Sequence, residues 1–176
     1  MILGLDVSTS ITGATLVNSD GEIIYNEAWD TRKYKNFFRK AEEINSKMDL
    51  LPATPTRIFI EQSLQSFRSG FSSAKTLSTL SRFNGVVSWI CYQRYAIEPE
   101  YLAATSARKS CGITVPRGTK AKQVVLQFLL DNEDGFSVQY TKQGNPKPES
   151  YDKADSIVIA RAGLILARNE KAQNFI

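Results

Sequence analysis

The sequence has 176 residues, of which 42% are hydrophobic and 23% are charged, and its formal net charge is +4. These values are typical of one globular domain with a single sizeable core, so we expect one domain over residues 1–176. The mild positive charge permits a nucleic-acid partner without requiring one. No stretch approaches the ~18 apolar residues of a membrane span, and the N-terminal residues lack a secretory signal pattern. We therefore expect a cytoplasmic domain that makes no membrane contact.

The sequence contains no histidine, which excludes Ser-His-Asp and Cys-His catalysis and nearly every zinc site. Cys91 and Cys111 have no metal-ligand spacing and are expected to be reduced thiols. Any hydrolysis would therefore depend on carboxylates, lysine or a metal-activated water.

The first residues predict a buried strand that carries one acid. Residues 2–7 are apolar except for Asp6, and burying a carboxylate costs several kcal/mol unless a cation or hydrogen bonds compensate it. A hydroxyl-rich turn is expected over residues 8–13, followed by a second strand over residues 14–17. An Asp-Gly turn then predicts a hairpin and a third, antiparallel strand over residues 22–29.

The rest of the chain is expected to alternate helices with short strands. Strands are expected at residues 57–61 and 97–102. Helices are expected at residues 35–51, 74–95, 105–111 and 151–168. A basic loop is expected at residues 112–122, and its last residues begin a further helix that runs to residue 130. Residues 62–73 and 133–150 are expected to be loops, the second of them mobile, and residues 169–176 a loose tail. This order predicts an α/β fold whose mixed five-stranded sheet, three antiparallel strands and then parallel ones, is flanked by helices.

Four acids mark the ends of predicted elements. Asp6 ends the first strand, Glu61 ends the fourth, and Asp152 and Asp155 lie one turn apart at the start of the last helix. The stripe of that helix that carries both aspartates continues with Ile159, Ala162 and Leu166. Taken singly, each acid has a structural explanation, because the helix dipole favours Asp in a first turn and a strand-end Glu often pairs with Arg. Taken together, the four suit a divalent-ion site, since Mg²⁺ prefers carboxylate oxygens and two such ions can clamp a phosphodiester.

Three segments resemble the motifs of one family in the same order along the chain. GLDVSTSITGATLV, IFIEQ and YDKADSIVIARA are similar to the acidic motifs of the RuvC-type Holliday junction resolvases, which belong to the ribonuclease H-like superfamily. Ser8 stands where the first motif of bacterial members usually has glycine, and such divergence is typical of a viral or phage member acting in the host cytoplasm. The resemblance implies a ribonuclease H-like sheet. It also implies that Asp6, Glu61, Asp152 and Asp155 are catalytic and bind two Mg²⁺ ions, or Mn²⁺ in their place. It implies a homodimer that nicks opposing strands of a four-way DNA junction in recombination and repair.

A basic segment lies between the second and third motifs and is similar to the one that follows the DNA backbone in that family. Its DNA-binding candidates are Arg108, Lys109, Arg117, Lys120 and Lys122. A solvated basic face is the commoner explanation of such a cluster. A loop that enters a helix N-terminus at Lys120 favours phosphate binding instead.

Two further candidates for DNA contact, Phe67 and Arg68, follow Glu61 in the expected loop. An exposed aromatic side chain there could stack on an unpaired base at a junction centre, as the resemblance implies, or could pin the loop to the core.

Three other functions remain open on the sequence. A broader nuclease for forks, flaps and Y-branches would carry the same acids. An actin- or sugar-kinase-like ATP-binding domain shares the first hairpin, but it needs a second such domain that 176 residues cannot hold. A DNA-binding module without activity would keep salt-dependent binding only.

Overall fold

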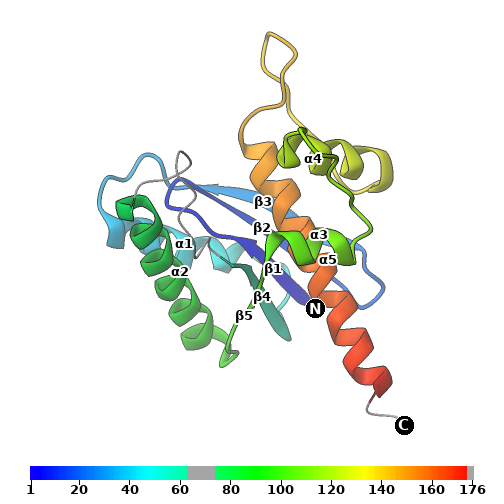
Figure 1. The fold of residues 1–176 in the computed structure, drawn as a ribbon. Coiled ribbons are helices and arrows are strands. Elements are labelled where there is room, and N and C mark those ends of the chain that lie inside the picture. The colour runs from blue at the N-terminus through cyan, green and yellow to red at the C-terminus, as the bar shows by residue number, and fades with distance from the viewer. Residues whose placement is uncertain (63–73, 174–176) are drawn as a thin grey trace.

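The computed structural model of the chain describes residues 1–62 and 74–173. Within this part, five strands form one sheet in the order β3-β2-β1-β4-β5 (Figure 1). The strands are β1 (Ile2–Asp6), β2 (Ile11–Val17), β3 (Ile23–Asp30), β4 (Arg57–Glu61) and β5 (Glu100–Leu102). Strands β1, β2 and β3 pair antiparallel, whereas β4 and β5 run parallel to β1. The predicted mixed five-stranded sheet, three antiparallel strands followed by parallel ones, is therefore confirmed.

The helices cover both faces of this sheet. They are α1 (Phe37–Lys47), the short 3₁₀ helix η1 (Met48–Leu50), α2 (Ala74–Tyr95), α3 (Ala104–Ser110), α4 (Ala121–Asn132) and α5 (Glu149–Gln173). Helices α1 and α2 pack on one face, while α5 crosses the other face with α3 and α4 outside it (Figure 1). In the described part of the chain, no helix has the length and apolarity to cross a membrane.

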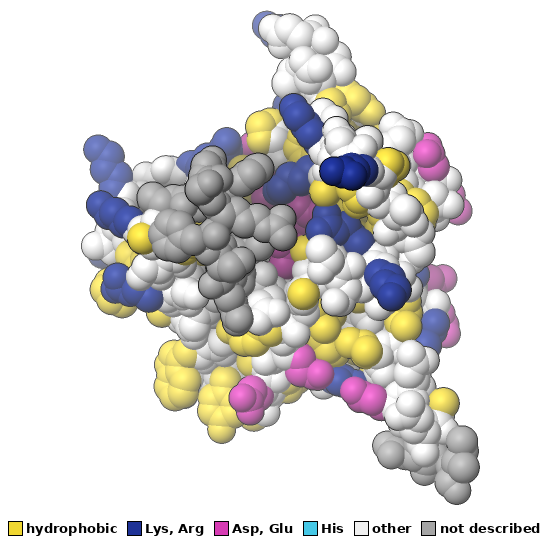
Figure 2. All heavy atoms as spheres, in the orientation of Figure 1, with side chains coloured by type: hydrophobic (Ala, Val, Ile, Leu, Met, Phe, Trp, Pro, Cys, Tyr) yellow, Lys and Arg dark blue, Asp and Glu magenta, His cyan; other side chains and the backbone are white. Residues whose placement is uncertain are grey.

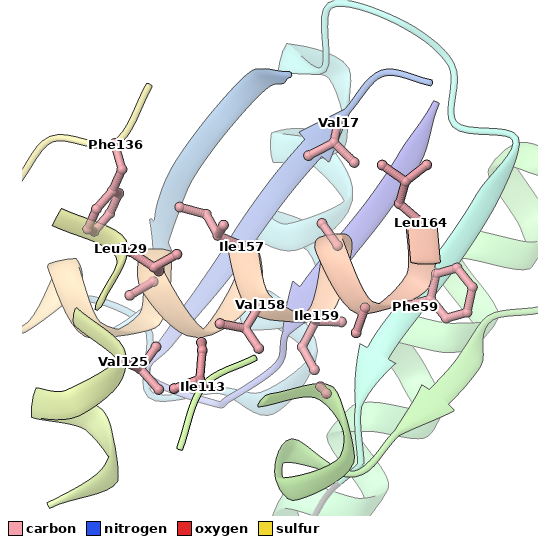
Figure 3. Packing of buried hydrophobic residues seen from close by; sticks show 14 of the residues in the cluster. Val17, Phe59, Ile113, Val125, Leu129, Phe136, Ile157, Val158, Ile159 and Leu164 are labelled. Atoms are coloured by element: carbon pink, nitrogen blue, oxygen red, sulfur yellow. The ribbon is translucent and has the colours of Figure 1, made fainter. Parts of the chain in front are cut away.

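Strand β1 is buried on both of its faces, as its apolar run predicts. Leu3 and Leu5 contribute to the core beneath α1 and α2, whereas Ile2 joins the core beneath α5. The α5 core continues with Phe59 of β4 and Ile157 of α5 (Figure 3). The two cores hold the sheet rigidly between its helices, which fixes the strand ends that carry acids.

Helix α5 lies unusually close to the sheet because glycines face it. A Cβ atom added at Gly4 would lie 2.4 Å from the backbone nitrogen of Ala160, and one added at Gly13 would lie 1.9 Å from the carbonyl oxygen of Asp152. Both distances are shorter than any real van der Waals contact. The helix backbone can therefore rest directly on β1 and β2.

Several predicted boundaries are wrong at one end. Strand β2 begins at Ile11 instead of residue 14, because the turn closes within residues 8–10. Helix α5 runs from Glu149 to Gln173, so residues 169–173 are helical and are not a loose tail. The ion pair between Nη1 of Arg57 and Oε2 of Glu170, 2.6 Å long, fastens these last turns to β4.

Two loops were expected after Glu61 and after α4. The first, residues 62–73, lies outside the described residues apart from residue 62. The second has no helix or named strand before Glu149, as expected of a loop, and contains one backbone bridge that joins Tyr140 to Pro146. Cys91 and Cys111 are both free thiols, as predicted.

Candidate active site

The four acids come from three elements that meet at one edge of the sheet. Asp6 ends β1 and Glu61 ends β4. These strands are parallel neighbours in the register Leu5 opposite Ile60, so the two acids that follow are also neighbours. This is the arrangement that the sequence pattern predicts for acids at the carboxyl ends of parallel strands.

Helix α5 brings the other two acids to the same edge. Asp152 lies in its first turn and its carbonyl oxygen packs on Gly13, the residue of β2 that pairs with Asp6. Asp155 follows one turn later, on the same side of the helix. The start of α5 therefore faces the end of β1.

Buried hydrogen bonds fix the first turns of α5 on the sheet. The hydroxyls of Thr15 and Ser156 lie 2.7 Å apart, and both side chains are fully buried. The amide nitrogen of Asn26 donates to Thr15 Oγ1 at 2.8 Å and to the carbonyl oxygen of Lys153 at 3.2 Å. Because Lys153 and Ser156 flank the two aspartates, this network determines where their carboxylates point.

The Ser8 hydroxyl shapes the turn that follows Asp6. It accepts hydrogen bonds from the backbone N–H groups of Ser10 and Ile11, both 3.1 Å long, and donates to the carbonyl oxygen of Ile11. The serine that replaces the expected glycine therefore closes the turn with its own side chain.

Burial raises the pKa values of all four carboxyl groups, and in three of them the charges of neighbouring acids add to the effect. Burial raises the pKa of Asp6 well above its usual range, and the charges of Glu61 and Asp155 add to this effect. Burial and the charge of Asp155 raise the pKa of Glu61 to about 7. Burial raises the pKa of Asp152 to about 6 and that of Asp155 in the same direction. Such a cluster is a strong attractor for cations.

Lys122 supplies a cation to this cluster. Its Nζ lies 3.4 Å from Oδ2 of Asp155 and 3.9 Å from Oδ1 of Asp152. Burial lowers the pKa of Lys122, but the charges of Asp155, Asp6 and Asp152 outweigh it and raise the pKa. Its side chain is 59% exposed, so the ammonium group also remains accessible to a phosphate. The sequence predicts Lys122 as a DNA contact only, and nothing in its spacing indicates the ion pairs with α5.

The chemistry of the cluster fits a hard divalent ion. All four side chains are carboxylates, the ligands that Mg²⁺ and Mn²⁺ prefer, and their raised pKa values reflect charge that a dication would neutralise. Within residues 1–62 and 74–173, however, no three acidic or cysteine side chains already form a group that could hold a metal ion. Lys122 Nζ instead neutralises the aspartates of α5, and a dication would compete with it.

No protein-family model matches this sequence, and no curated protein matches it. Solved structures do match it. RuvC of Thermus thermophilus in complex with Holliday junction substrate superposes with a TM-score of 0.66 at 14% identity, over 96% of this chain and 94% of that chain. A second structure of Thermus thermophilus RuvC superposes with a TM-score of 0.63 at 15% identity, over 96% of each chain. The yeast mitochondrial Holliday junction resolvase Ydc2 gives 0.59 at 14% identity, over 99% of this chain and 84% of that one. The chain has the RuvC-type resolvase fold.

Two of the predicted DNA-binding residues, Arg108 and Lys122, lie beside the acids. Arg108 is half-buried, and its charge acts on Glu61 and Asp155, whose pKa values it lowers against the larger effect of burial. Lys109, Arg117 and Lys120 are exposed. Figure 2 shows Lys and Arg side chains around a recess that contains acidic side chains. Phe67 and Arg68 lie outside the described residues.

We expect the metal-free protein to lose stability as the pH rises. The folded pKa values of about 7 for Glu61 and about 6 for Asp152 lie above the ordinary values of 4.5 and 3.8. The folded state therefore binds more protons than the unfolded state in this range, and the free energy of unfolding falls between about pH 4 and 7. Thermal unfolding in EDTA should show a fall of roughly 5 °C over this interval. Added Mg²⁺ should reverse it at pH 8, whereas a melting temperature that rises with pH would contradict the burial of these acids.

Replacing Lys122 by methionine should strengthen metal binding. The side chain keeps its length, but no ammonium group then competes with a dication for Asp152 and Asp155. Titration calorimetry of the DNA-free protein with Mn²⁺ should give an affinity about tenfold higher, with a lower melting temperature in EDTA. Lys120→Met is the matched control, because Lys120 is exposed and forms no ion pair with a described acid. Equal affinities of the two variants for Mn²⁺ would contradict competition at Lys122.

Proposed function

We propose that this protein is a metal-dependent endodeoxyribonuclease that resolves four-way DNA junctions by paired, symmetric nicks. The observation that carries the proposal is the meeting of Asp6, Glu61, Asp152 and Asp155 at one sheet edge, with the cations Lys122 and Arg108 beside them. The fold shared with known resolvases supports the same activity. The cytoplasm, of the host if the protein is viral, is the compartment we propose.

In this proposal, Asp6, Glu61, Asp152 and Asp155 hold two Mg²⁺ or Mn²⁺ ions. When bound, such ions supply an activated water and stabilise charge on the phosphodiester. The protein's own groups orient the DNA. With metal bound, Lys122 would no longer pair with the aspartates and, with Arg108, would hold the phosphate nearest the acids, because both cations act on the cluster.

More distant cations hold the DNA backbone on either side of that phosphate. Lys109, Arg117 and Lys120 are exposed on α3, on the loop that follows it and at the start of α4. Salt-dependent phosphate contacts of this kind position a duplex without reading its sequence. The sequence resemblance makes Phe67 and Arg68 the candidates for contact with the junction centre, and both lie outside the described residues.

Paired nicks need two active sites, and an exposed apolar surface on α1 and α2 suits a homodimer. Phe38 is 65% exposed and Trp89 is 59% exposed, which is unusual for large apolar side chains. The Trp89 ring stacks on Tyr92 with centroids 6.0 Å apart. A two-fold contact through this surface would leave both acidic recesses free for opposing strands.

Incubation with synthetic DNA in Mg²⁺ tests the function. A labelled four-way junction, a Y-fork and a linear duplex of equal length are compared at the same protein concentration. We expect symmetric, ligatable nicks in the junction and far slower cutting of the duplex. Equal rates on the junction and the fork would favour the broader branched-DNA nuclease. An absence of cutting on all three substrates would overturn both activities.

A further inference from the structure

The segment between α4 and α5 forms a β-ribbon that projects from the body of the protein (Figure 1). Its two sides are joined by the backbone hydrogen bonds from Lys147 N to Gln139 O and from Thr141 N to Asn145 O, both 2.8 Å long. The turn closes with a bond from Gly144 N to Thr141 O, and Gly144 has a φ of +79°, which glycine adopts without strain. The ribbon, residues 138–147, is therefore a built element.

The base of the ribbon is fixed to the core and its tip is not. Phe136 is buried in the α5 core, Val138 packs against that core, and Ser150 is buried at the other end. In contrast, residues 142–145 are exposed, and Tyr140 is 53% exposed. An anchored base beneath a solvated tip is typical of an arm that reaches another molecule.

The ribbon carries only positive charge. Residues 135–148 contain Lys142 and Lys147 and no Asp or Glu, although acids flank the segment on both sides. Lys147 Nζ donates to Oε1 of Gln139 along the ribbon, 3.0 Å away, whereas Lys142 stands in the turn. This charge, together with an exposed tyrosine, is complementary to the phosphate backbone of a nucleic acid.

The ribbon is also directly continuous with the acidic site. Its second side enters α5 at Glu149, one turn before Asp152. Its tip extends roughly 16 Å from its base, at ~3.3 Å per residue. The first turn of α5, from Glu149 to Asp152, adds about 4.5 Å at ~1.5 Å per residue. The tip therefore reaches up to roughly 20 Å from the acids, a distance that spans about six base pairs at ~3.4 Å each.

From this placement we infer that the ribbon is a second DNA-binding element, which holds the duplex arm about six base pairs from the cleaved phosphate. The inference rests on the proposed function, because it uses the acids as the position of the cut. Lys142 contacts the backbone of the arm, and the phenol of Tyr140 lies beside the same strand. The ribbon thus sets the angle at which one arm leaves the site.

Removing charge from the protein and, separately, from the DNA tests this contact. Lys142→Gln is compared with Lys171→Gln, which removes the same charge from the exposed far end of α5. Binding to a four-way junction is measured in EDTA, where no cutting occurs, over a range of salt concentrations. We expect Lys142→Gln to weaken binding about fivefold and to reduce the salt slope by about one, with little effect of Lys171→Gln.

The DNA is changed in parallel. Uncharged methylphosphonates replace the phosphates four to eight base pairs from the crossover, or fourteen to eighteen base pairs from it in the control junction. The nearer methylphosphonates should weaken junction binding by the wild-type protein. They should not weaken binding by Lys142→Gln any further, because the two changes remove the same contact.

Two results would overturn the inference. One is equal behaviour of the two lysine variants. The other concerns a variant whose ribbon is shortened by replacing residues 141–145 with Asn-Gly. If this variant binds the junction as wild type does but sediments with a different mass, the ribbon makes a protein contact and not a DNA contact. If the wild-type protein itself shows no preference for the junction, the proposed function fails. If the wild type prefers the junction and Lys142→Gln matches its control, only the ribbon's role fails.

Discussion

Replacing Asp6 by asparagine should abolish junction cleavage and leave junction binding intact. Asp6 lies between Glu61 and the aspartates of α5, and its pKa is raised by burial and by all three of them, so in the proposed site it would be the central ligand. Bound metal supplies several kcal/mol of transition-state stabilisation, and each 1.36 kcal/mol is a factor of ten in rate. We expect a loss of about 10³-fold or more in single-turnover cleavage.

Binding and stability distinguish this loss from misfolding. Asparagine has nearly the same shape as aspartate and carries no buried charge, so the metal-free variant should melt at a higher temperature than wild type. Removal of a carboxylate also reduces repulsion of DNA, so affinity for the junction in EDTA should be unchanged or slightly higher. Glu98→Gln is the control, because Glu98 is exposed just before β5, at the opposite edge of the sheet. Cleavage by Asp6→Asn within tenfold of wild type would remove Asp6 from the site.

The positions of the acids could be predicted because local patterns determine them. An apolar run that ends in an acid identifies both Asp6 and Glu61, and parallel pairing of β1 with β4 puts them side by side. The stripe from Asp152 to Leu166 is buried at Ile159 and Ala162, both 1% exposed. Contacts of α5 with the sheet, however, are made by Ser156, Ala160 and Gly163. The order of strands and helices follows from the same periodicities.

The contacts that fix these acids could not be predicted, because each joins segments distant in sequence. The hydrogen bond between Thr15 and Ser156 spans 141 residues, and neither hydroxyl differs in sequence from an ordinary surface group. The pairing of Lys122 with α5 likewise depends on how α4 packs. The ribbon was missed because its exposed residues have no hydrophobic periodicity, and its backbone hydrogen bonds leave no pattern in the sequence.

Gly13→Ala should reduce both stability and activity, because α5 rests directly on this glycine at the turn that carries Asp152. The added Cβ would lie 1.9 Å from Asp152 O and 2.5 Å from its carbonyl carbon, so the backbone of α5 must move. Overpacking of this kind costs about 3 kcal/mol, or a fall of roughly 6–12 °C in melting temperature. Gly85→Ala is the control, since nothing lies within 4 Å of its added Cβ on α2 and alanine favours a helix.

The cleavage rate of Gly13→Ala should fall by more than its loss of folded protein can explain. Gly13 pairs with Asp6 across β1 and β2, so the displaced helix end carries Asp152 and Asp155 away from Asp6 itself. A displacement of about 1 Å can cost about 10²-fold in rate even when the fold survives. Cleavage measured well below the melting temperature of Gly13→Ala, with Gly85→Ala beside it, separates the two effects. Wild-type cleavage by a folded Gly13→Ala protein would mean that the α5 acids need no fixed distance from β1, which is incompatible with a shared site.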